Sequence, residues 1–290
     1  MWEDLVCKEE IMNLIKKNPV LSYFAITFLI SWGGVIILGS PYGMPATNEQ
    51  FHALWTAVVL PYFLGPALAG LLMTAIIGGR TGFRELRDRL FKWRIGLKWY
   101  AIALLTAPLI VAPLLFIFSL FSPVFLPGIV TAADKVTAII TGIVTGVLFG
   151  GLMEELGWTG FAVPALQKRF STIKTGLIVG ILHGVWHFPV KILISGPLGL
   201  APFLAVDLMT AVVNLTAWRI LMVWVYGRTG GSLLVTMLMH ASLTANTLFI
   251  LVPAATGRSL IVYNLAAAVV AWVVIAAIAL IDRRSKEVKI

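Results

Sequence analysis

Long apolar runs separated by short polar segments are the main pattern of this sequence. Eight runs are long enough to cross a membrane, for which an α-helix needs about 20 predominantly apolar residues. They cover approximately residues 20–39, 54–78, 99–122, 138–164, 174–192, 202–226, 231–251 and 260–281. We therefore predict an all-α fold, a polytopic membrane bundle of about eight transmembrane helices, with residues 1–290 forming one transmembrane domain.

The composition agrees with this interpretation. Hydrophobic residues make up 59% of the chain and charged residues only 12%, whereas soluble domains carry roughly 25% charged residues. A chain with so few polar groups cannot cover the surface of a globule in water. Soluble classes of protein are therefore excluded.

The distribution of basic residues predicts the orientation. When successive spans cross the membrane in opposite directions, 18 of the 22 Lys and Arg residues fall on one side of the membrane and 3 on the other. Arg219 lies inside a span. Because cytoplasmic loops carry the excess of basic residues, we expect an integral protein of the inner or plasma membrane with both termini in the cytoplasm. The net charge of +9 then faces membrane lipids, and no nucleic-acid partner is expected.

The cytoplasmic segment 81–98 is basic and has an apolar side. Its apolar members are Phe83, Leu86, Leu90, Phe91 and Trp93. This pattern predicts an amphipathic helix lying on the membrane surface, and an ordinary helix in a cytoplasmic loop is the alternative.

Five ionisable side chains stand out within the apolar runs. Glu154 and Glu155 are adjacent in the fourth span, although a carboxylate in hydrocarbon costs at least ~2.5–3.5 kcal/mol. Three of the four histidines, His183, His187 and His240, also lie within spans. Because intramembrane ionisable groups usually mark functional sites, we expect these residues to form one.

Depth estimates place these groups in one layer. With a rise of 1.5 Å per residue, the distances from the cytoplasmic face are ~14 Å for His183 and His240, ~20 Å for His187, ~13–15 Å for the glutamates and ~12 Å for Arg219. His183 and His187 are four residues apart and share a helix face. The side chains can therefore meet in the cytoplasmic half of the bilayer.

A glycine ridge precedes the glutamates. Gly142, Gly146 and Gly150 recur every four residues, a spacing that lets two transmembrane helices approach closely. We expect another helix to pack against the fourth span here.

Two kinds of hydrolytic chemistry fit this residue set. A carboxylate beside imidazoles can deprotonate water, and N–H donors can stabilise the resulting oxyanion. Alternatively, Glu154, His187 and His240 could hold Zn²⁺, which lowers the pKa of bound water. The sequence leaves open whether the protein uses no cofactor or zinc.

At these residues the chain resembles the CPBP (CAAX protease and bacteriocin-processing, or Abi) intramembrane proteases, which are related to the type II CAAX prenyl endopeptidases. Three motifs carry the resemblance, with the patterns EExxxR, FxxxH and HxxxN. They correspond to "EELGWTGFAVPALQ" with Glu154 and Glu155, "HGVWHFP" with His187, and "RTGGSLLVTMLMHASLTAN" with His240. The resemblance covers about residues 140–250, which would be the catalytic core.

The resemblance implies an intramembrane endopeptidase that is either glutamate-dependent or a zinc metalloprotease. Glu154 would activate water with His187, and His240 would form the oxyanion hole together with the asparagine of the third motif. The substrate would be a membrane-associated or lipidated peptide or protein, cut near its C-terminus after entering a cavity open to the cytoplasm.

The chain departs from the family pattern at three positions. The arginine of EExxxR is Thr159, so Glu155 lacks its expected partner, and we predict that Arg219 replaces it. The phenylalanine of FxxxH is His183, which adds an imidazole and favours a metal site somewhat. The asparagine of HxxxN is Thr244, and its supporting role could pass to Thr244 itself or to a nearby amide. The candidate amides are Asn246 and Asn214.

Two other classes of function remain open. A non-catalytic relative would act as a membrane scaffold or as a bacteriocin or phage immunity factor. A proton-coupled carrier would also use buried Glu, His and Arg groups, but its polar groups should extend across both halves of the membrane. Asp207, expected near the outer face, is the one residue that favours a carrier.

Overall fold

The computed structural model describes residues 2–287, with side chains for residues 9–55 and 57–281. Its α-helices are α1 (Trp2–Lys17), α2 (Pro19–Gly39), α3 (Asn48–Leu90), α4 (Leu97–Ser119), α5 (Gly128–Thr131), α6 (Lys135–Thr145), α7 (Glu155–Gly157), α8 (Val163–Gln167), α9 (Thr172–Trp186), α10 (Phe188–Ile194), α11 (Leu204–Arg228), α12 (Leu233–Ala245) and α13 (Gly257–Glu287). Three π-helical stretches, η3 (Gly146–Glu154), η4 (Trp158–Ala162) and η6 (Asn246–Ile250), join or extend them, and the short 3₁₀ turns are Ser40–Tyr42, Pro123–Phe125 and Ala201–Phe203. The described residues form no strand.

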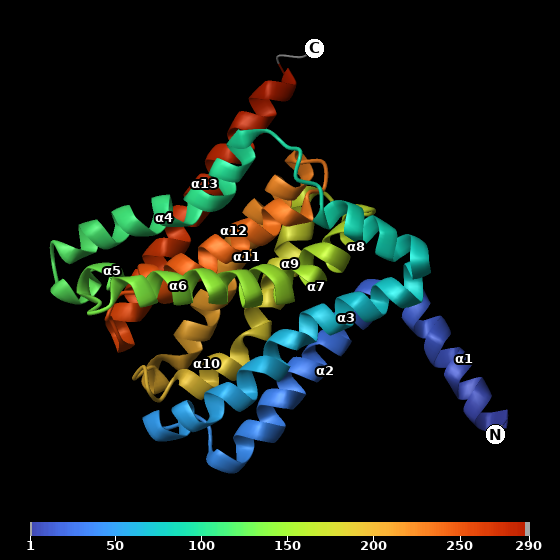
Figure 1. Ribbon diagram of the computed structural model, residues 1–290, viewed down its shortest axis with the longest axis horizontal. Coiled ribbons are helices and arrows are strands. Elements are labelled where there is room, and N and C mark those ends of the chain that lie inside the picture. Colours follow the sequence, from blue (N-terminus) through green and yellow to red (C-terminus); the bar gives the residue numbers. More distant parts are fainter. Residues whose placement is uncertain (1, 288–290) are drawn as a thin grey trace.

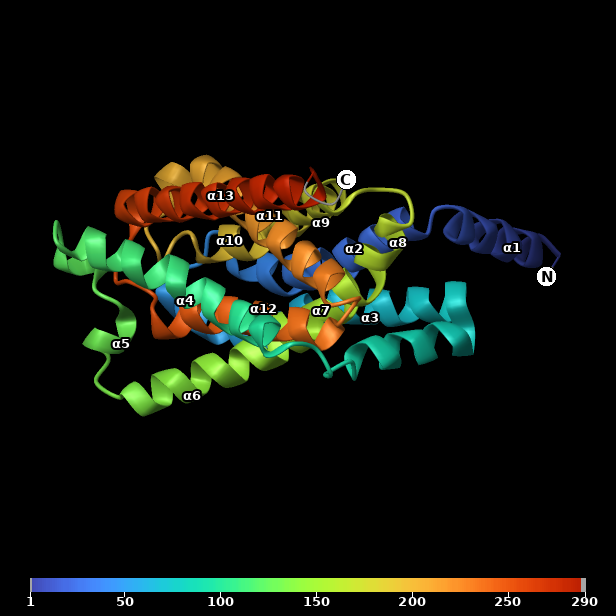
Figure 2. The same ribbon diagram turned by 90° about the horizontal axis from the view of Figure 1, so that it is seen from above.

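Eight helical segments are long and apolar enough to cross a membrane, as the hydrophobic pattern predicts. They are Pro19–Tyr42, Ala57–Leu90, Leu97–Ser119, Lys135–Gln167, Thr172–Ile194, Ala201–Arg228, Leu233–Ile250 and Gly257–Ile281. The protein is an integral membrane helix bundle. Helix α1 precedes the first span and projects away from the bundle in both views (Figures 1 and 2).

The fourth span is one continuous helical rod whose hydrogen-bonding pattern changes along its length. It starts as α6, becomes π-helical in η3, passes through α7 and η4, and ends as α8. A π-helical turn takes in one extra residue and rotates the side chains that follow, and such turns are frequent at functional sites. Both glutamates of the span lie at the junction of η3 and α7.

Two glycine ridges bring the helices around this rod together. A Cβ added at Gly142 would lie 3.0 Å from Phe249, and one at Gly146 or Gly150 would collide with Ala241 or with Thr244. The predicted close approach at the fourth span is thereby confirmed, and the partner helix is α12 with its extension η6.

Helices α9 and α11 pack through a second ridge that the sequence analysis did not single out. Cβ atoms added at Gly176, Gly180 and Gly184 would lie 2.7, 2.5 and 2.5 Å from Cα atoms of α11. Side chains of larger residues would hold these backbones apart. The ridges thus set the spacing of the helices that carry His183, Arg219, Glu154 and His240.

The cytoplasmic segment after the second span differs from the prediction. Helix α3 breaks at Gly79, whose φ of 52° suits glycine, and ends at Leu90 rather than continuing to Lys98. The following residues are held by tertiary contacts, because Lys92 Nζ donates to the Gly230 carbonyl at 2.7 Å and Ser232 Oγ donates to the Lys92 carbonyl at 2.7 Å. These bonds to the α11–α12 turn replace the last helical turn.

Candidate active site

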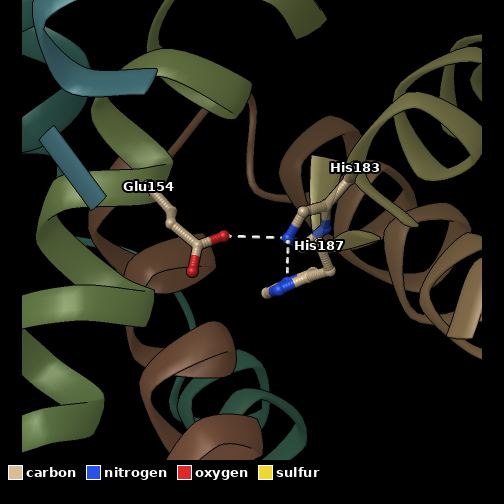
Figure 3. Close-up of side chains that lie close together, drawn as sticks. All are labelled: Glu154, His183 and His187. Carbon is tan, nitrogen blue, oxygen red and sulfur yellow. Dashed lines mark hydrogen bonds and ion pairs between the residues drawn. The ribbon is translucent and has the colours of Figure 1, made fainter. Parts of the chain in front are cut away.

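Glu154 lies at the centre of a buried polar cluster. Its side chain is only 2% exposed. Its Oε2 atom lies 2.8 Å from Nε2 of His183 (Figure 3) and accepts a hydrogen bond from the indole nitrogen of Trp158 at 3.1 Å. His240 Nε2 is 3.9 Å from the same oxygen. The carboxylate therefore faces residues from three different spans.

Glu155 is fully buried and has a separate set of partners. Its Oε1 atom accepts from Arg219 Nη1 at 2.5 Å and lies 2.7 Å from His240 Nδ1. Its Oε2 atom accepts from the hydroxyl of Thr159. Because a buried charge needs a charged and hydrogen-bonded partner, this arrangement explains how the carboxylate is tolerated. The predicted pairing of Arg219 with Glu155 is present, and Thr159 adds a bond that the sequence did not reveal.

Arg219 links the two halves of the cluster. It is 1% exposed, and its Nε atom donates to Nδ1 of His183 at 3.0 Å. A guanidinium group can only donate, so Nδ1 of His183 carries no proton. In neutral His183 the proton is therefore on Nε2, which faces Glu154 and His187.

His187 lies at a break in the fifth span. Helix α9 ends at Trp186 and α10 begins at Phe188, because Pro189 cannot supply the backbone N–H of a continuous helix. His187 Nε2 is 3.2 Å from Nε2 of His183 (Figure 3), and its Nδ1 is 2.9 Å from the hydroxyl of Tyr62. The break thus leaves the two histidines in contact, as their spacing predicts.

Thr244 lies beside the cluster, one helical turn beyond His240. A Cβ added at Gly150 would meet both its Oγ1 and His240 Cδ2. No described contact joins the other two polar candidates to the cluster. Asn246 donates to the carbonyl and hydroxyl oxygens of Ser242 in its own helix, and Asn214 Oδ1 is buried with no hydrogen-bond partner.

The geometry disagrees with zinc in the expected set. Among the described residues, the ligand atoms that cluster within 4.8 Å of one another belong to Glu154, His183 and His187, with His240 outside the group. A histidine that binds metal through Nε2 normally donates from its other nitrogen, yet Nδ1 of His183 accepts from Arg219. Metal binding by this group would therefore require His183 to lose its bond from Arg219.

Two residues of the site were missed by sequence reasoning. Trp158 is four residues from Glu154, so its contact could have been found from helical spacing. Tyr62 lies in α3, 125 positions from His187, and no local pattern points to it.

Asp207 stands apart from this cluster. It is 1% exposed and pairs with Lys191 at 2.9 Å. This ion pair satisfies the buried carboxylate locally. The described polar side chains of Glu154, Glu155, His183, Arg219 and His240 instead converge in one place, which favours the hydrolytic interpretation over a carrier path.

A cavity of about 810 Å³ lies at the end of the fourth span. It is bounded by the start of α2, the part of α3 on both sides of its break, and α8, and its lining includes Gly160 and Phe161. Its basic lining residues are Lys17, Arg89, Lys168 and Arg169. Its lining includes none of Glu154, Glu155 and His183.

Comparisons with known proteins match the part of the chain that carries the three motifs. Residues 136–246 match the family model described as type II CAAX prenyl endopeptidase Rce1-like. CAAX prenyl protease 2 of Methanococcus maripaludis is 25% identical over 180 residues, which cover 60% of this chain and 63% of that protein. The chain thus aligns with less than two thirds of that relative's length. The resemblance that the three motifs predict is confirmed: residues 136–246 of this chain are similar to the Rce1-like type II CAAX prenyl endopeptidases.

Proposed function

We propose that this protein is an intramembrane endopeptidase that hydrolyses a peptide bond with a water molecule activated by Glu154. The observation that carries the proposal is the convergence of Glu154 with His183 at 2.8 Å and of His183 with His187 at 3.2 Å in a buried site. A carboxylate held beside imidazoles and away from bulk water is suited to general-base catalysis.

In this proposal Glu154 takes the proton from water while His187 orients the water through the lone pair of its unprotonated Nε2. The hydroxide attacks the peptide carbonyl, and the proton passes to the leaving amine. His240 Nδ1 faces Glu155 at 2.7 Å and donates to it, so His240 stabilises the oxyanion from Nε2 when both ring nitrogens carry protons. Thr244 supplies a hydroxyl from the same helix face.

Glu155 has a supporting role in this proposal. Its carboxylate is occupied by Arg219, His240 and Thr159. It therefore orients His240 and holds Arg219 near Glu154, at 3.9 Å. A carboxylate with so many hydrogen bonds is a poor proton acceptor. We therefore assign the role of general base to Glu154.

We propose a peptide or lipidated protein as the substrate, cut near its C-terminus within a catalytic core of residues 140–250. The similarity to the Rce1-like model supports this class, and the Methanococcus relative is named a CAAX prenyl protease. In this proposal the substrate enters by way of the cavity of about 810 Å³ at the end of the fourth span. With both termini in the cytoplasm, as the basic residues favour, this route opens to the cytoplasm.

The test is cleavage by purified protein in detergent. Quenched peptides that end in a CAAX sequence are offered with and without a prenyl group, and products are identified by mass spectrometry. The proposal predicts one cut near the C-terminus and none with buffer alone. Intact peptides of both kinds, with folded protein, would favour the non-catalytic scaffold or immunity role.

A further inference from the structure

Tyr62 contacts the site from a helix that carries none of the family motifs. It lies in α3, its side chain is 1% exposed, and its hydroxyl is 2.9 Å from Nδ1 of His187. The same hydroxyl is 3.4 Å from the carbonyl oxygen of Trp186. Tyr62 can therefore accept from the histidine while donating to the backbone.

The proton positions follow from Arg219 outward. Because Arg219 donates to Nδ1 of His183, the proton of neutral His183 lies on Nε2. This N–H lies 2.8 Å from Glu154 Oε2 and 3.2 Å from His187 Nε2. A proton on His187 Nε2 would point at the protonated nitrogen of His183, which has no lone pair to accept it. His187 Nε2 is therefore unprotonated, and its ring proton lies on Nδ1.

Tyr62 completes this chain of donors. His187 Nδ1–H donates to the Tyr62 oxygen, and the Tyr62 hydroxyl donates to the Trp186 carbonyl. Each of these two donors then faces an acceptor. A hydrogen bond from one ring nitrogen commonly decides the tautomer of a functional histidine.

The ring of Tyr62 is held in place by two further contacts. It stacks on Trp186 with ring centroids 3.9 Å apart and planes 17° apart. Its backbone carbonyl lacks a helical donor because Pro66, four residues on, has no N–H, and Ser31 Oγ donates to it at 2.6 Å instead. The hydroxyl is thus presented to His187 from a fixed position.

We propose that Tyr62 is a positioning residue that keeps His187 in the tautomer protonated on Nδ1, so that its Nε2 lone pair faces Glu154 and His183. The catalytic consequence rests on the proposed peptidase function. The tautomer itself does not, because it follows from the hydrogen bonds alone.

The test is nitrogen NMR of ¹⁵N-histidine-labelled full-length protein in detergent micelles. The chain has four histidines, and His187→Gln identifies the signals of His187. Wild-type protein should show a protonated Nδ1 and an unprotonated Nε2 for this residue. Tyr62→Phe keeps the ring stack and removes the hydroxyl, so it should mix the two tautomers. Tyr42→Phe, at a tyrosine that is 51% exposed, should leave the signals unchanged.

Cleavage kinetics provide the second readout. Tyr62→Phe should lower kcat by roughly fivefold to tenfold, the effect of losing one hydrogen bond, with KM unchanged. A wild-type His187 protonated on Nε2, or identical His187 signals in wild type and Tyr62→Phe, would overturn the positioning role. Wild-type protein could also show the expected tautomer and cleave no peptide. That result would support the positioning role and overturn the peptidase function, so failure of one proposal can be told from failure of the other.

Discussion

Arg219 Nη1 lies 2.5 Å from Glu155 Oε1, although 64 positions separate the two residues. Both side chains are buried. The arginine that the family motif places four residues after this glutamate is Thr159 here. The positive charge that pairs with Glu155 therefore comes from α11, a different helix.

Removal of this arginine should inactivate the protein. Arg219→Leu leaves Glu155 as a buried charge without its partner, which costs about 3–5 kcal/mol, and it frees the Nδ1 atom of His183. We expect a lower melting temperature and loss of peptide cleavage. Arg258→Leu, at an exposed arginine at the start of α13 and outside the cavity lining, is the control.

A second-site variant makes this prediction sharper. Thr159→Arg in the Arg219→Leu background places an arginine at the motif position, four residues from Glu155. Part of the melting temperature should return. If Arg219→Leu alone melts and cleaves like wild type, the pairing of Arg219 with Glu155 contributes neither to stability nor to activity.

The glycine ridge of the fourth span should be intolerant of a single methyl group. A Cβ at Gly146 collides with the Ala241 carbonyl of α12, so Gly146→Ala should lower the free energy of unfolding by about 1–3 kcal/mol. Gly78→Ala, where a Cβ meets open space, is the matched control. Thermal unfolding in detergent measures both, and equal melting temperatures would show that the two helices can move apart freely.

Thr244 should contribute to oxyanion stabilisation. Thr244→Val keeps the shape of the side chain and removes the hydroxyl, so kcat should fall by roughly 10-fold or more while KM stays constant. Asn246→Ala should have little effect on kcat, because that amide is bonded within its own helix. The reverse ranking of the two variants would move the role to Asn246.

Metal chelation should leave cleavage unchanged. Nδ1 of His183 accepts from Arg219, whereas a metal-binding histidine normally donates from its other nitrogen. The measurement is the cleavage rate after dialysis against a chelator, with zinc added back to a parallel sample. A rate that falls on dialysis and returns with zinc would contradict this arrangement.

Much of the architecture could be predicted from the sequence because hydrocarbon imposes strict rules. Apolar runs of sufficient length located all eight spans, and the depth of each polar group indicated that Glu154, His183 and Arg219 could meet. Both inferences depend only on rise per residue and on the cost of burying charge.

The remaining details depend on contacts between distant segments. The end of α3 at Leu90 follows from the bonds of Lys92 to the α11–α12 turn, and the contact of Tyr62 with His187 joins two separate spans. The π-helical stretches decide the direction of Glu154, and no residue pattern marks where they begin. These features required the folded structure.

The most direct test of the account is the cleavage rate of Glu154→Gln. This variant keeps the size of the side chain and its contact with Trp158 but cannot accept a proton from water. Glu49→Gln, at an exposed glutamate in α3, is the control. The account predicts that Glu154→Gln loses at least roughly 10²–10⁴-fold in kcat while remaining folded and Glu49→Gln matches wild type. A Glu154→Gln protein that cleaves within about threefold of the wild-type rate, less than a general base contributes, would contradict it.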